Sequence, residues 1–382
     1  MSRSDDRALV WGDARRVLCV RLDNLGDVLM TAPAIRALRA ASRERHVTLL
    51  ASPSGAEAAC MLPGIDATIA YDAPWMKSKA PLRAARDLDM RDTLAAGRFD
   101  AAVIFTVYSQ SPLPAATLCY LAGIPLRVAH CRENPYGLLT DWIPETEPAS
   151  TIRHEVRRQL DLVTSVGASC SEEAMRIVVP SAARAAMRRT LCDMGIGSRD
   201  RLIVLHPGAT APSRTYPADR FADVARILVQ RTDATIVVTG SSDERALARS
   251  VAATGCERIV NGAGRFTLPE LCALIERAAL LVSNNTGPVH IASSVGTPVV
   301  DLYALTNPQH TPWHVPHRVL FHDVACRYCY KSVCPEGHNL CLRGVTVDDV
   351  VAAAFDLLDG AAGSAVAMPT RAARVIPQVA AS

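Results

Sequence analysis

The segment from Val17 to about Ala41 constrains the fold of this chain more than any other. An apolar run over Val17–Leu22 predicts a buried strand, Gly26 marks a turn, and Asp27 opens a helical stretch. A buried strand that leads directly into a helix is the first unit of a doubly wound domain, whose ligands bind beyond the carboxyl ends of parallel strands. The segment therefore predicts an α/β fold with Asp27 at its ligand edge.

Asp27 stands where a phosphate-binding loop would carry glycines and a lysine. A carboxylate repels a phosphate, so this loop suits a base that takes a proton from an uncharged hydroxyl. Asp is also favoured at helix N-termini, where it meets free N–H groups and the positive end of the dipole. Read alone, the loop leaves helix capping and catalysis open.

Short apolar strands alternate with helix-length segments through both halves of the chain, which predicts parallel sheets covered on both faces. The strands expected in the first half are Val17–Leu22, Val47–Ala51, Ala67–Tyr71, Ala101–Phe105, Leu126–Ala129 and Met175–Val179, and its helices are Asp27–Ala41, Leu82–Ala96, Leu113–Leu121 and Ile152–Val166. The strands expected in the second half are Leu202–Leu205, Thr235–Thr239, Arg258–Val260, Leu280–Ser283 and Val299–Leu302. The stretch 131–148, rich in turn signals, is expected to be irregular.

A chain of 382 residues suits two domains. We expect an N-terminal Rossmann-like domain over 1–185, a C-terminal one over 186–345, a final helix over 346–360 and a disordered tail over 361–382. Two doubly wound domains in tandem predict a cleft between them.

Composition excludes several classes of function. A formal net charge of +3 is too small to indicate nucleic-acid binding. The polar opening residues predict no secretory signal, and no apolar run reaches the roughly 18 residues of a membrane span. We therefore expect a cytoplasmic protein, and we read most of the 12 cysteines as reduced core thiols.

Three loops of the second half together predict an anion site. The loop from His206 to Pro217 offers hydroxyls and a fixed charge, a Thr-Gly pair begins a helix where free N–H groups favour phosphate, and an acidic pair after a strand suits ribose hydroxyls. The candidate residues are Thr210, Ser213, Arg214, Asp243, Glu244, Thr286 and Gly287. Taken singly, each loop is equally typical of a helix cap.

Two further motifs are weaker. Gly262-Ala-Gly264 lacks the third glycine of a dinucleotide fingerprint. Asp87-Leu-Asp89 matches the two-acid pattern of metal-dependent sugar transferases, but its charged helical context favours a solvated face.

Four cysteines form a dense cluster over sixteen residues: Cys326, Cys329, Cys334 and Cys341. Four thiols can close a tetrahedral structural zinc site, although the spacing is not that of a standard finger or ribbon. The alternatives are a cysteine-rich loop without metal and disulfides formed on oxidation.

The segment from Ala73 to Arg83 combines Trp75 and Met76 with the cations Lys77, Lys79 and Arg83. It is a candidate contact for anionic lipid or an acceptor phosphate, and an ordinary exposed loop is the alternative.

Four segments together resemble the bacterial heptosyltransferases of glycosyltransferase family 9, which add heptose from ADP-heptose to the lipopolysaccharide inner core. They are Arg21-Leu-Asp-Asn-Leu-Gly-Asp-Val28 with Thr31-Ala-Pro33; His154-Glu-Val-Arg-Arg158; His206-Pro-Gly-Ala209 with Tyr216-Pro217 and Arg220-Phe221; and Asn285-Thr-Gly-Pro-Val-His290 with Gly296-Thr-Pro-Val-Val300. Their order and spacing cover about residues 17 to 360.

The resemblance implies a GT-B architecture, with the acceptor on the first domain and the nucleotide-sugar on the second. It implies an inverting reaction that needs no catalytic metal, an ADP-sugar donor, and a glycolipid acceptor at the inner face of the membrane. Asp27 matches the family's general base, Thr210 and Arg214 match its diphosphate contacts, and Thr286, Gly287 and His290 match its sugar-phosphate loop. Asn285 replaces a more usual Asp, which leaves the donor sugar open.

Two other functions remain open on the sequence. A nucleotide-sugar epimerase with the same two-domain layout would consume donor without an acceptor. A catalytically impaired nucleotide-sugar-binding protein, with Asn285 marking the loss, would bind donor without turnover.

Overall fold

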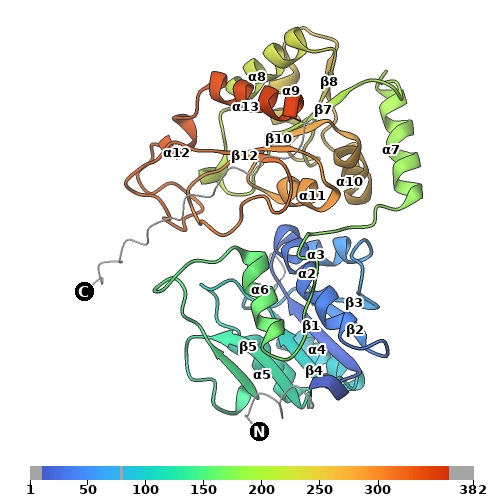
Figure 1. Ribbon diagram of the computed structural model, residues 1–382, viewed down its shortest axis with the longest axis vertical. Helices are drawn as coiled ribbons and strands as arrows, with labels where there is room; N and C mark the ends of the chain where they lie inside the picture. The colour runs from blue at the N-terminus through green and yellow to red at the C-terminus, as the bar shows by residue number, and fades with distance from the viewer. Residues whose placement is uncertain (1–10, 78–80, 361–382) are drawn as a thin grey trace. The chain divides into compact units, whose positions relative to one another are not determined.

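The computed structural model describes residues 11–77 and 81–360. They fall into two compact units, the first ending at Glu173 and the second beginning at Ala174. Each unit is built on one sheet of six strands, and all the strand pairs are parallel (Figure 1). The predicted α/β class and doubly wound architecture are confirmed. The expected tail over 361–382 lies outside the described residues.

The sheet of the first unit has the strand order β3-β2-β1-β4-β5-β6. Its strands are β1 (Arg16–Arg21), β2 (His46–Ala51), β3 (Ala67–Ala70), β4 (Ala101–Ile104), β5 (Leu126–Cys131) and β6 (Asp141–Pro144). Its helices are α2 (Leu25–Ala40), α3 (Pro53–Ala59), α4 (Ala84–Ala96), α5 (Leu113–Leu121) and α6 (Glu155–Thr164), with a 3-10 turn, η1 (Tyr136–Leu138). This is the strand order of a dinucleotide-binding fold. Successive strands are added on one side of β1 up to β3, and on the other side from β4 onward, while all of them stay parallel.

The second unit repeats that order as β9-β8-β7-β10-β11-β12. Its strands are β7 (Leu202–His206), β8 (Thr235–Val238), β9 (Ile259–Asn261), β10 (Leu280–Asn284), β11 (Val299–Leu302) and β12 (His317–Leu320). Its helices are α7 (Ser181–Asp193), α8 (Ala218–Arg231), α9 (Arg245–Ala252), α10 (Leu268–Arg277), α11 (Gly287–Val295), α12 (Leu340–Arg343) and α13 (Val347–Gly360), with a 3-10 turn, η2 (Pro212–Arg214). Successive strands are again added on one side of β7 up to β9, and on its other side from β10 onward.

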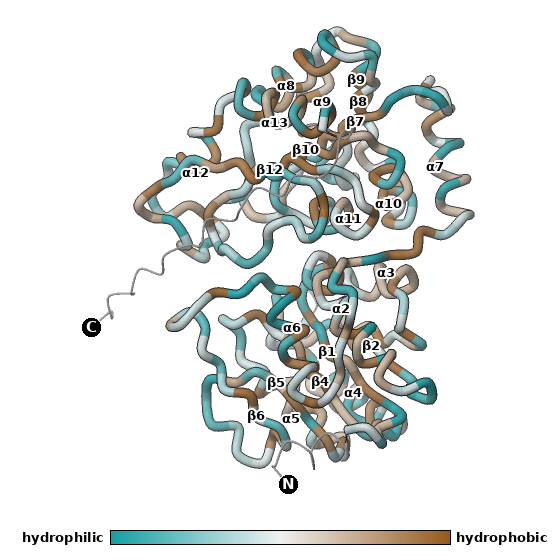
Figure 2. Tube along the Cα trace, viewed as in Figure 1, coloured by the Kyte–Doolittle hydropathy of each residue, from teal (hydrophilic) through white to brown (hydrophobic). Residues whose placement is uncertain are grey.

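Burial on both faces explains why these strands form. In β1, Leu18 and Val20 join a core cluster with Leu94 of α4, while Val17 and Cys19 are equally buried and point to the other face. Figure 2 shows hydrophobic residues concentrated on the strands and alternating with hydrophilic ones along α7, which is partly solvated. The inner strands of both sheets are therefore buried, as parallel sheets covered on two sides require.

One edge strand of each sheet was not predicted. The stretch expected to be irregular contains the edge strand β6, in which Ile143-Pro144 closes the strand rather than a turn. Proline is tolerated there because an edge strand does not need every N–H for pairing. The edge strand β12 was not predicted, since its Arg and His residues break the apolar pattern.

The predicted strand Met175–Val179 is wrong, because these residues pair with neither sheet. They are extended, and Ile177 donates one backbone hydrogen bond to the Ser294 carbonyl at 3.4 Å. They belong to the second unit together with α7, which packs on α10. The units thus divide at Glu173, before the expected boundary at 185, and the helix expected over 346–360 appears as α13, packed on α8 within the second unit.

None of the described helices combines the length and the apolar character that crossing a membrane requires.

Candidate functional site

The carboxyl end of β1 carries a cluster of charged side chains. Arg21, the last residue of the strand, is fully buried and contacts three carboxylates. Its Nε lies 2.9 Å from Asp23 Oδ2, its Nη2 3.2 Å from Asp27 Oδ1, and its Nη1 2.9 Å from Glu155 Oε1. The cluster thus joins the end of β1, the start of α2 and the start of α6.

Asp27 is the third residue of α2, and Asn24 occupies the N-cap position without a side-chain capping bond. A carboxylate in the first turn is favoured by the helix dipole whether or not it is the cap. Of the three carboxylates on Arg21, Asp27 is the most exposed, at 16% of its side chain against 10% for Asp23 and 0% for Glu155. Its position combines a stabilised charge with partial access to solvent.

Burial raises the pKa values of the other two acids, Asp23 and Glu155. It raises the pKa of Asp23, although Arg21 and a 2.6 Å hydrogen bond from Gln110 Nε2 oppose the shift. It also raises the pKa of Glu155, against the opposing charge of Arg21. Both acids therefore hold protons more tightly than free carboxylic acids do.

A second ion network supports α6. Arg158 is buried and pairs with Glu145 and with Glu147, the latter at 3.4 Å. His130 lies against the Arg158 carbonyl, and burial with nearby cations lowers its pKa to about 3, so it stays neutral. His154 is the N-cap of α6 and accepts a hydrogen bond from the Val156 N–H at 3.2 Å.

In the second unit, the ends of β7 and β8 meet around a glycine. A Cβ on Gly208 would lie 2.2 Å from Glu244 Oε1, so only glycine leaves room for this carboxylate. Glu244 also accepts a hydrogen bond from the Ser241 N–H at 2.7 Å, which fixes it in the loop after β8. Of the predicted acidic pair, Glu244 is half-buried and lies over the β7 loop, while Asp243 is exposed.

Asn284 ties the end of β10 to the loop after β7. Its Nδ2 donates to the Pro207 carbonyl at 2.7 Å, and its Oδ1 accepts from the Tyr216 N–H at 3.0 Å. The side chain is fully buried, so it fixes the loop by both of its polar ends. The parallel sheet therefore brings the His206–Pro217 loop and the Thr286-Gly287 helix start to one edge, as predicted.

Ser213 has a structural contact that the sequence did not indicate. It is buried, its hydroxyl donates to the Lys331 carbonyl at 2.8 Å, and its N–H donates to the Ser332 carbonyl at 3.0 Å. Its neighbour Arg214 is half-buried in η2, and Thr210 is exposed. Thr210 and Arg214 are therefore more accessible than Ser213.

Asn285, in the loop between β10 and α11, is held by a buried acid. Its Nδ2 donates to Asp301 Oδ2 and to the His310 carbonyl, each at 2.9 Å. Asp301 is fully buried at the end of β11, and burial raises its pKa to about 8 in spite of the bond from Asn285. His290, of the same predicted loop, is buried on α11.

Asp301→Asn is expected to change how stability depends on pH. The folded chain holds the Asp301 proton up to about pH 8, whereas the unfolded chain releases it near 3.8. Between these two pH values the native state binds more protons than the unfolded state. The free energy of unfolding therefore falls as pH rises, by at most about 1.4 kcal/mol for each pH unit. The variant should therefore gain stability relative to wild type between pH 5 and pH 8 in urea titrations. The exposed Asp233→Asn should show a constant difference, and a constant difference for Asp301→Asn would contradict the assignment.

The four clustered cysteines line one pocket, together with His338. His338 Nδ1 accepts from the Leu340 N–H at 2.9 Å, and its Nε2 lies 3.8 Å from Cys326 Sγ. Among residues 11–77 and 81–360, no group of three or more His, Cys, Asp or Glu side chains is placed to hold a metal ion. The structural zinc therefore stays a prediction, which a measurement of the metal content of the purified protein tests.

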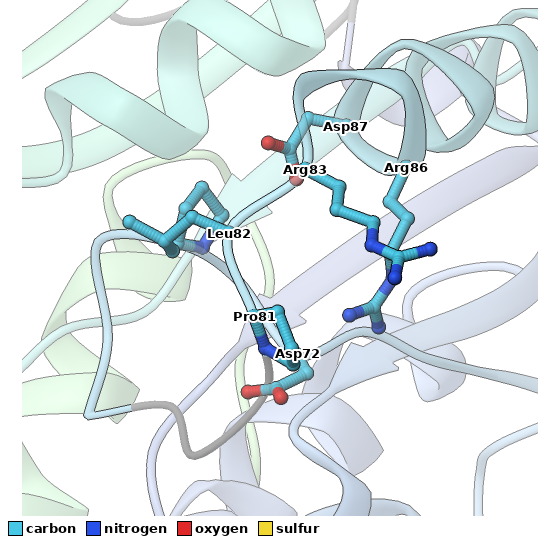
Figure 3. Close-up of a pocket in the computed structure, with 7 residues that line it drawn as sticks. Asp72, Pro81, Leu82, Arg83, Arg86 and Asp87 are labelled. Carbon is cyan, nitrogen blue, oxygen red and sulfur yellow. The ribbon is translucent and has the colours of Figure 1, made fainter.

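The predicted basic loop is only partly described, since Lys79 lies outside the described residues. Trp75 and Met76 pack against the core of the first unit, so they are not the exposed apolar part of the segment. Arg83 lies at the start of α4 and lines a pocket with Arg86, the exposed Leu82 and the acids Asp72 and Asp87 (Figure 3). Lys77 is exposed.

Several residues of the candidate site were not assigned a role from the sequence: Arg21 and Glu155 beside Asp27, Asn284 and Asp301 beside the loop before α11, and Arg86 in the pocket of α4. Two signals were available, because Arg21 and Glu155 stand in segments that carry the family resemblance, and an arginine in a strand expected to be buried requires a buried partner. Which residues pair with each other could not be read from these segments, because the partners lie far apart in the sequence.

The chain is similar to known proteins of one family. The model of glycosyltransferase family 9 (heptosyltransferase) matches residues 88–340. Lipopolysaccharide heptosyltransferase 3 of Escherichia coli strain K12 is 32% identical over 186 residues, an alignment that spans 47% of this chain and about half, 52%, of that protein. A second Escherichia coli lipopolysaccharide heptosyltransferase 3 is 25% identical to this chain. The alignment spans 74% of this chain and 81% of that protein.

Solved structures show the same fold. A family 9 glycosyltransferase from Veillonella parvula superposes with a TM-score of 0.77 at 24% identity, over 90% of this chain and 97% of that one. The Escherichia coli ADP-heptose lps heptosyltransferase II superposes with a TM-score of 0.72 at 21% identity, over 91% and 100%. The family model covers about two thirds of the chain, so this protein belongs to glycosyltransferase family 9, the heptosyltransferase family.

Proposed function

We propose that this protein transfers heptose from an ADP-sugar to a glycolipid acceptor of the lipopolysaccharide core, with inversion at the anomeric carbon. The observation that carries the proposal is Asp27, a partly exposed carboxylate that Arg21 holds at the ligand edge of the first sheet. The names of the relatives support the substrates, since they are lipopolysaccharide heptosyltransferases and one solved relative is an ADP-heptose enzyme.

The reaction is a single in-line displacement. Asp27 accepts the proton of the acceptor hydroxyl as that oxygen forms a bond to the anomeric carbon. The bond from the anomeric carbon to the diphosphate oxygen breaks on the opposite face, and ADP leaves with the electron pair. The carboxylate is suited to this role because it is partly exposed in the first turn of α2 and Arg21 orients it.

The loops of the second unit are suited to the donor. Negative charge grows on the leaving diphosphate, and the N-terminus of α11 at Gly287 with the cation of Arg214 would stabilise that charge. Thr210 and Thr286 add hydroxyl groups, while Glu244 and Asp243 face the ribose in this proposal. These groups supply positive charge and hydrogen bonds themselves, so the proposed chemistry needs no catalytic metal.

Asn285 is proposed to contact the sugar as a hydrogen-bond acceptor. Asp301 and the His310 carbonyl take up its Nδ2, so the amide cannot rotate without losing both bonds. The orientation leaves Oδ1 for a sugar hydroxyl, the same hydrogen bond that a carboxylate at this position would accept. A fixed amide thus replaces the charge without losing the acceptor.

The pocket at the start of α4 is proposed to bind a phosphate of the acceptor. Arg83 and Arg86 line it and extend in the same direction (Figure 3). Asp72 and Asp87 also line the pocket, so a phosphate would compete with these two carboxylates for the guanidinium groups. The adjacent Leu82, 73% exposed, would rest against lipid if the acceptor is bound at a membrane surface, as this proposal expects.

Arg86→Glu is expected to raise KM for a phosphorylated acceptor by about tenfold, because one charge-assisted contact of about 1.5 kcal/mol is replaced by repulsion. The KM for the donor should not change. Arg91→Glu, further along α4, is the matched control. Equal effects of both substitutions on the acceptor would show that the pocket is not a specific site.

The proposed function is tested by incubating the protein with ADP-heptose and a lipopolysaccharide core that lacks its outer heptoses. We expect release of ADP that depends on the acceptor, with heptose gained by the core. Consumption of ADP-heptose without acceptor would instead indicate an epimerase, and binding without turnover over a panel of acceptors would indicate a binding protein.

A further inference from the structure

Arg21 is shared by more carboxylates than one cation neutralises. Asp23, Asp27 and Glu155 all lie within 3.2 Å of its guanidinium. The contact from Nη2 to Asp27 Oδ1 is a hydrogen bond, and Nε and Nη1 form ion pairs with Asp23 and Glu155. The guanidinium is therefore held by two acids and directed at the third.

Glu155 is placed by several contacts of its own. It is fully buried as the first residue of α6, and Gln159 Nε2, one turn later, donates to its Oε1 at 2.6 Å. Gln159 also donates to the Thr106 carbonyl at 3.0 Å, which fixes the amide between α6 and the loop after β4. A side chain held this tightly is suited to fixing the guanidinium that it contacts.

We propose that Arg21 and Glu155 are positioning residues for Asp27, with Arg21 orienting the carboxylate and the charge of Glu155 limiting how far Arg21 neutralises it. The inference rests on the proposed role of Asp27 as the base and on a charged Glu155. The cations Arg21 and Arg158 and the hydrogen bond from Gln159 favour that charge, against the burial that raises the pKa of Glu155. An arginine that serves one carboxylate alone lowers that acid's pKa by about 1–3 units and makes it a weaker base. A second buried acid on the same guanidinium opposes this loss.

The charged groups around this contact in the first unit are few. Asp23 approaches Arg21 from the loop after β1, and Glu155 approaches it from α6. Arg158, also on α6, acts on Glu155 through its charge and is itself paired with Glu145 and Glu147. Replacing Glu155 by its neutral isostere therefore removes the main charge that competes with Asp27 for Arg21.

Glu155→Gln is the variant that tests the inference, assayed with ADP-heptose and the truncated core. We expect the acid limb of the pH–kcat profile to move down by about one pH unit. We also expect kcat on its plateau to fall about 3–10-fold, because a weaker base takes up the proton less readily. The KM for ADP-heptose should stay within about twofold of wild type, as this change leaves the donor loops untouched.

Two further variants keep the test decisive. Glu145→Gln makes the same change in another buried Arg–Glu pair, and its acid limb should stay in place. Gln159→Met removes the hydrogen bond that favours the charge on Glu155, so it should move the limb in the same direction by a smaller amount, even if Glu155→Gln fails to fold. A limb that stays fixed in both Glu155→Gln and Gln159→Met, or that moves equally in Glu145→Gln, would overturn the inference.

These outcomes are separate from failure of the proposed function. If wild type transfers heptose and Asp27→Asn does not, the function stands whatever Glu155→Gln shows. If Asp27→Asn keeps wild-type turnover, the base is elsewhere, and the inference falls with that part of the proposal.

Discussion

Asp27→Asn is expected to lower kcat for heptose transfer by about 10²–10⁴-fold, the usual contribution of a positioned base. An amide of the same size cannot accept the hydroxyl proton, so attack on the anomeric carbon would need water as the base. The affinity for ADP, measured by calorimetry, should stay near wild type, because the donor loops belong to the second unit. The loss should therefore appear in kcat rather than in KM for the donor.

The charge balance around Arg21 separates this effect from misfolding. Three carboxylates share one guanidinium, so removing the charge of Asp27 leaves Arg21 paired with Asp23 and Glu155. The melting temperature should accordingly change little. Asp219→Asn, which also neutralises an acid in the first turn of a helix, is the control and should cost only about 0.3–1 kcal/mol of stability, with kcat preserved. If Asp27→Asn behaved like Asp219→Asn, Asp27 would serve only to stabilise α2.

The central strands were predictable because burial on both faces leaves a strong apolar pattern. β1, β7 and β10 sit in the middle of their sheets, and their apolar runs stand out in the sequence. The edge strands β6 and β12 are partly solvated and contain Pro, Arg or His, so their patterns resemble loops. Hydrophobic periodicity therefore finds the interior of such a sheet more readily than its edges.

The candidate site was predictable in a similar, partial way. Residues that follow a central strand, such as Asp27 and Arg214, could be found because parallel strands bring their carboxyl ends to one edge. Their supports could not, because each comes from another segment: Glu155 reaches Arg21 from α6, and Lys331 holds Ser213 from 118 residues away. Such contacts depend on tertiary packing and leave no spacing in the sequence.

Arg214→Ala is expected to lower kcat by about 10²–10³-fold, the typical cost of removing one group that stabilises developing charge. The backbone around Arg214 is fixed on both sides, by the bonds of Ser213 to Lys331 and Ser332 and by the bond from the Tyr216 N–H to Asn284. Shortening the side chain therefore removes the cation without loosening the loop. Because charge on the diphosphate grows as the bond breaks, kcat should fall more than the affinity for the intact donor.

Arg214→Lys provides the matched variant, since it keeps the charge but loses the planar fork of donors. We expect it to recover most of the activity, because a lysine suffices as a point charge on a phosphate. Arg226→Ala, which removes an exposed cation from α8, controls for a general change in net charge and should leave kcat unchanged. If Arg214→Lys were as inactive as Arg214→Ala, the geometry of the guanidinium rather than its charge would hold the diphosphate. If Arg214→Ala retained wild-type kcat, the N-terminus of α11 would be sufficient to stabilise the leaving group.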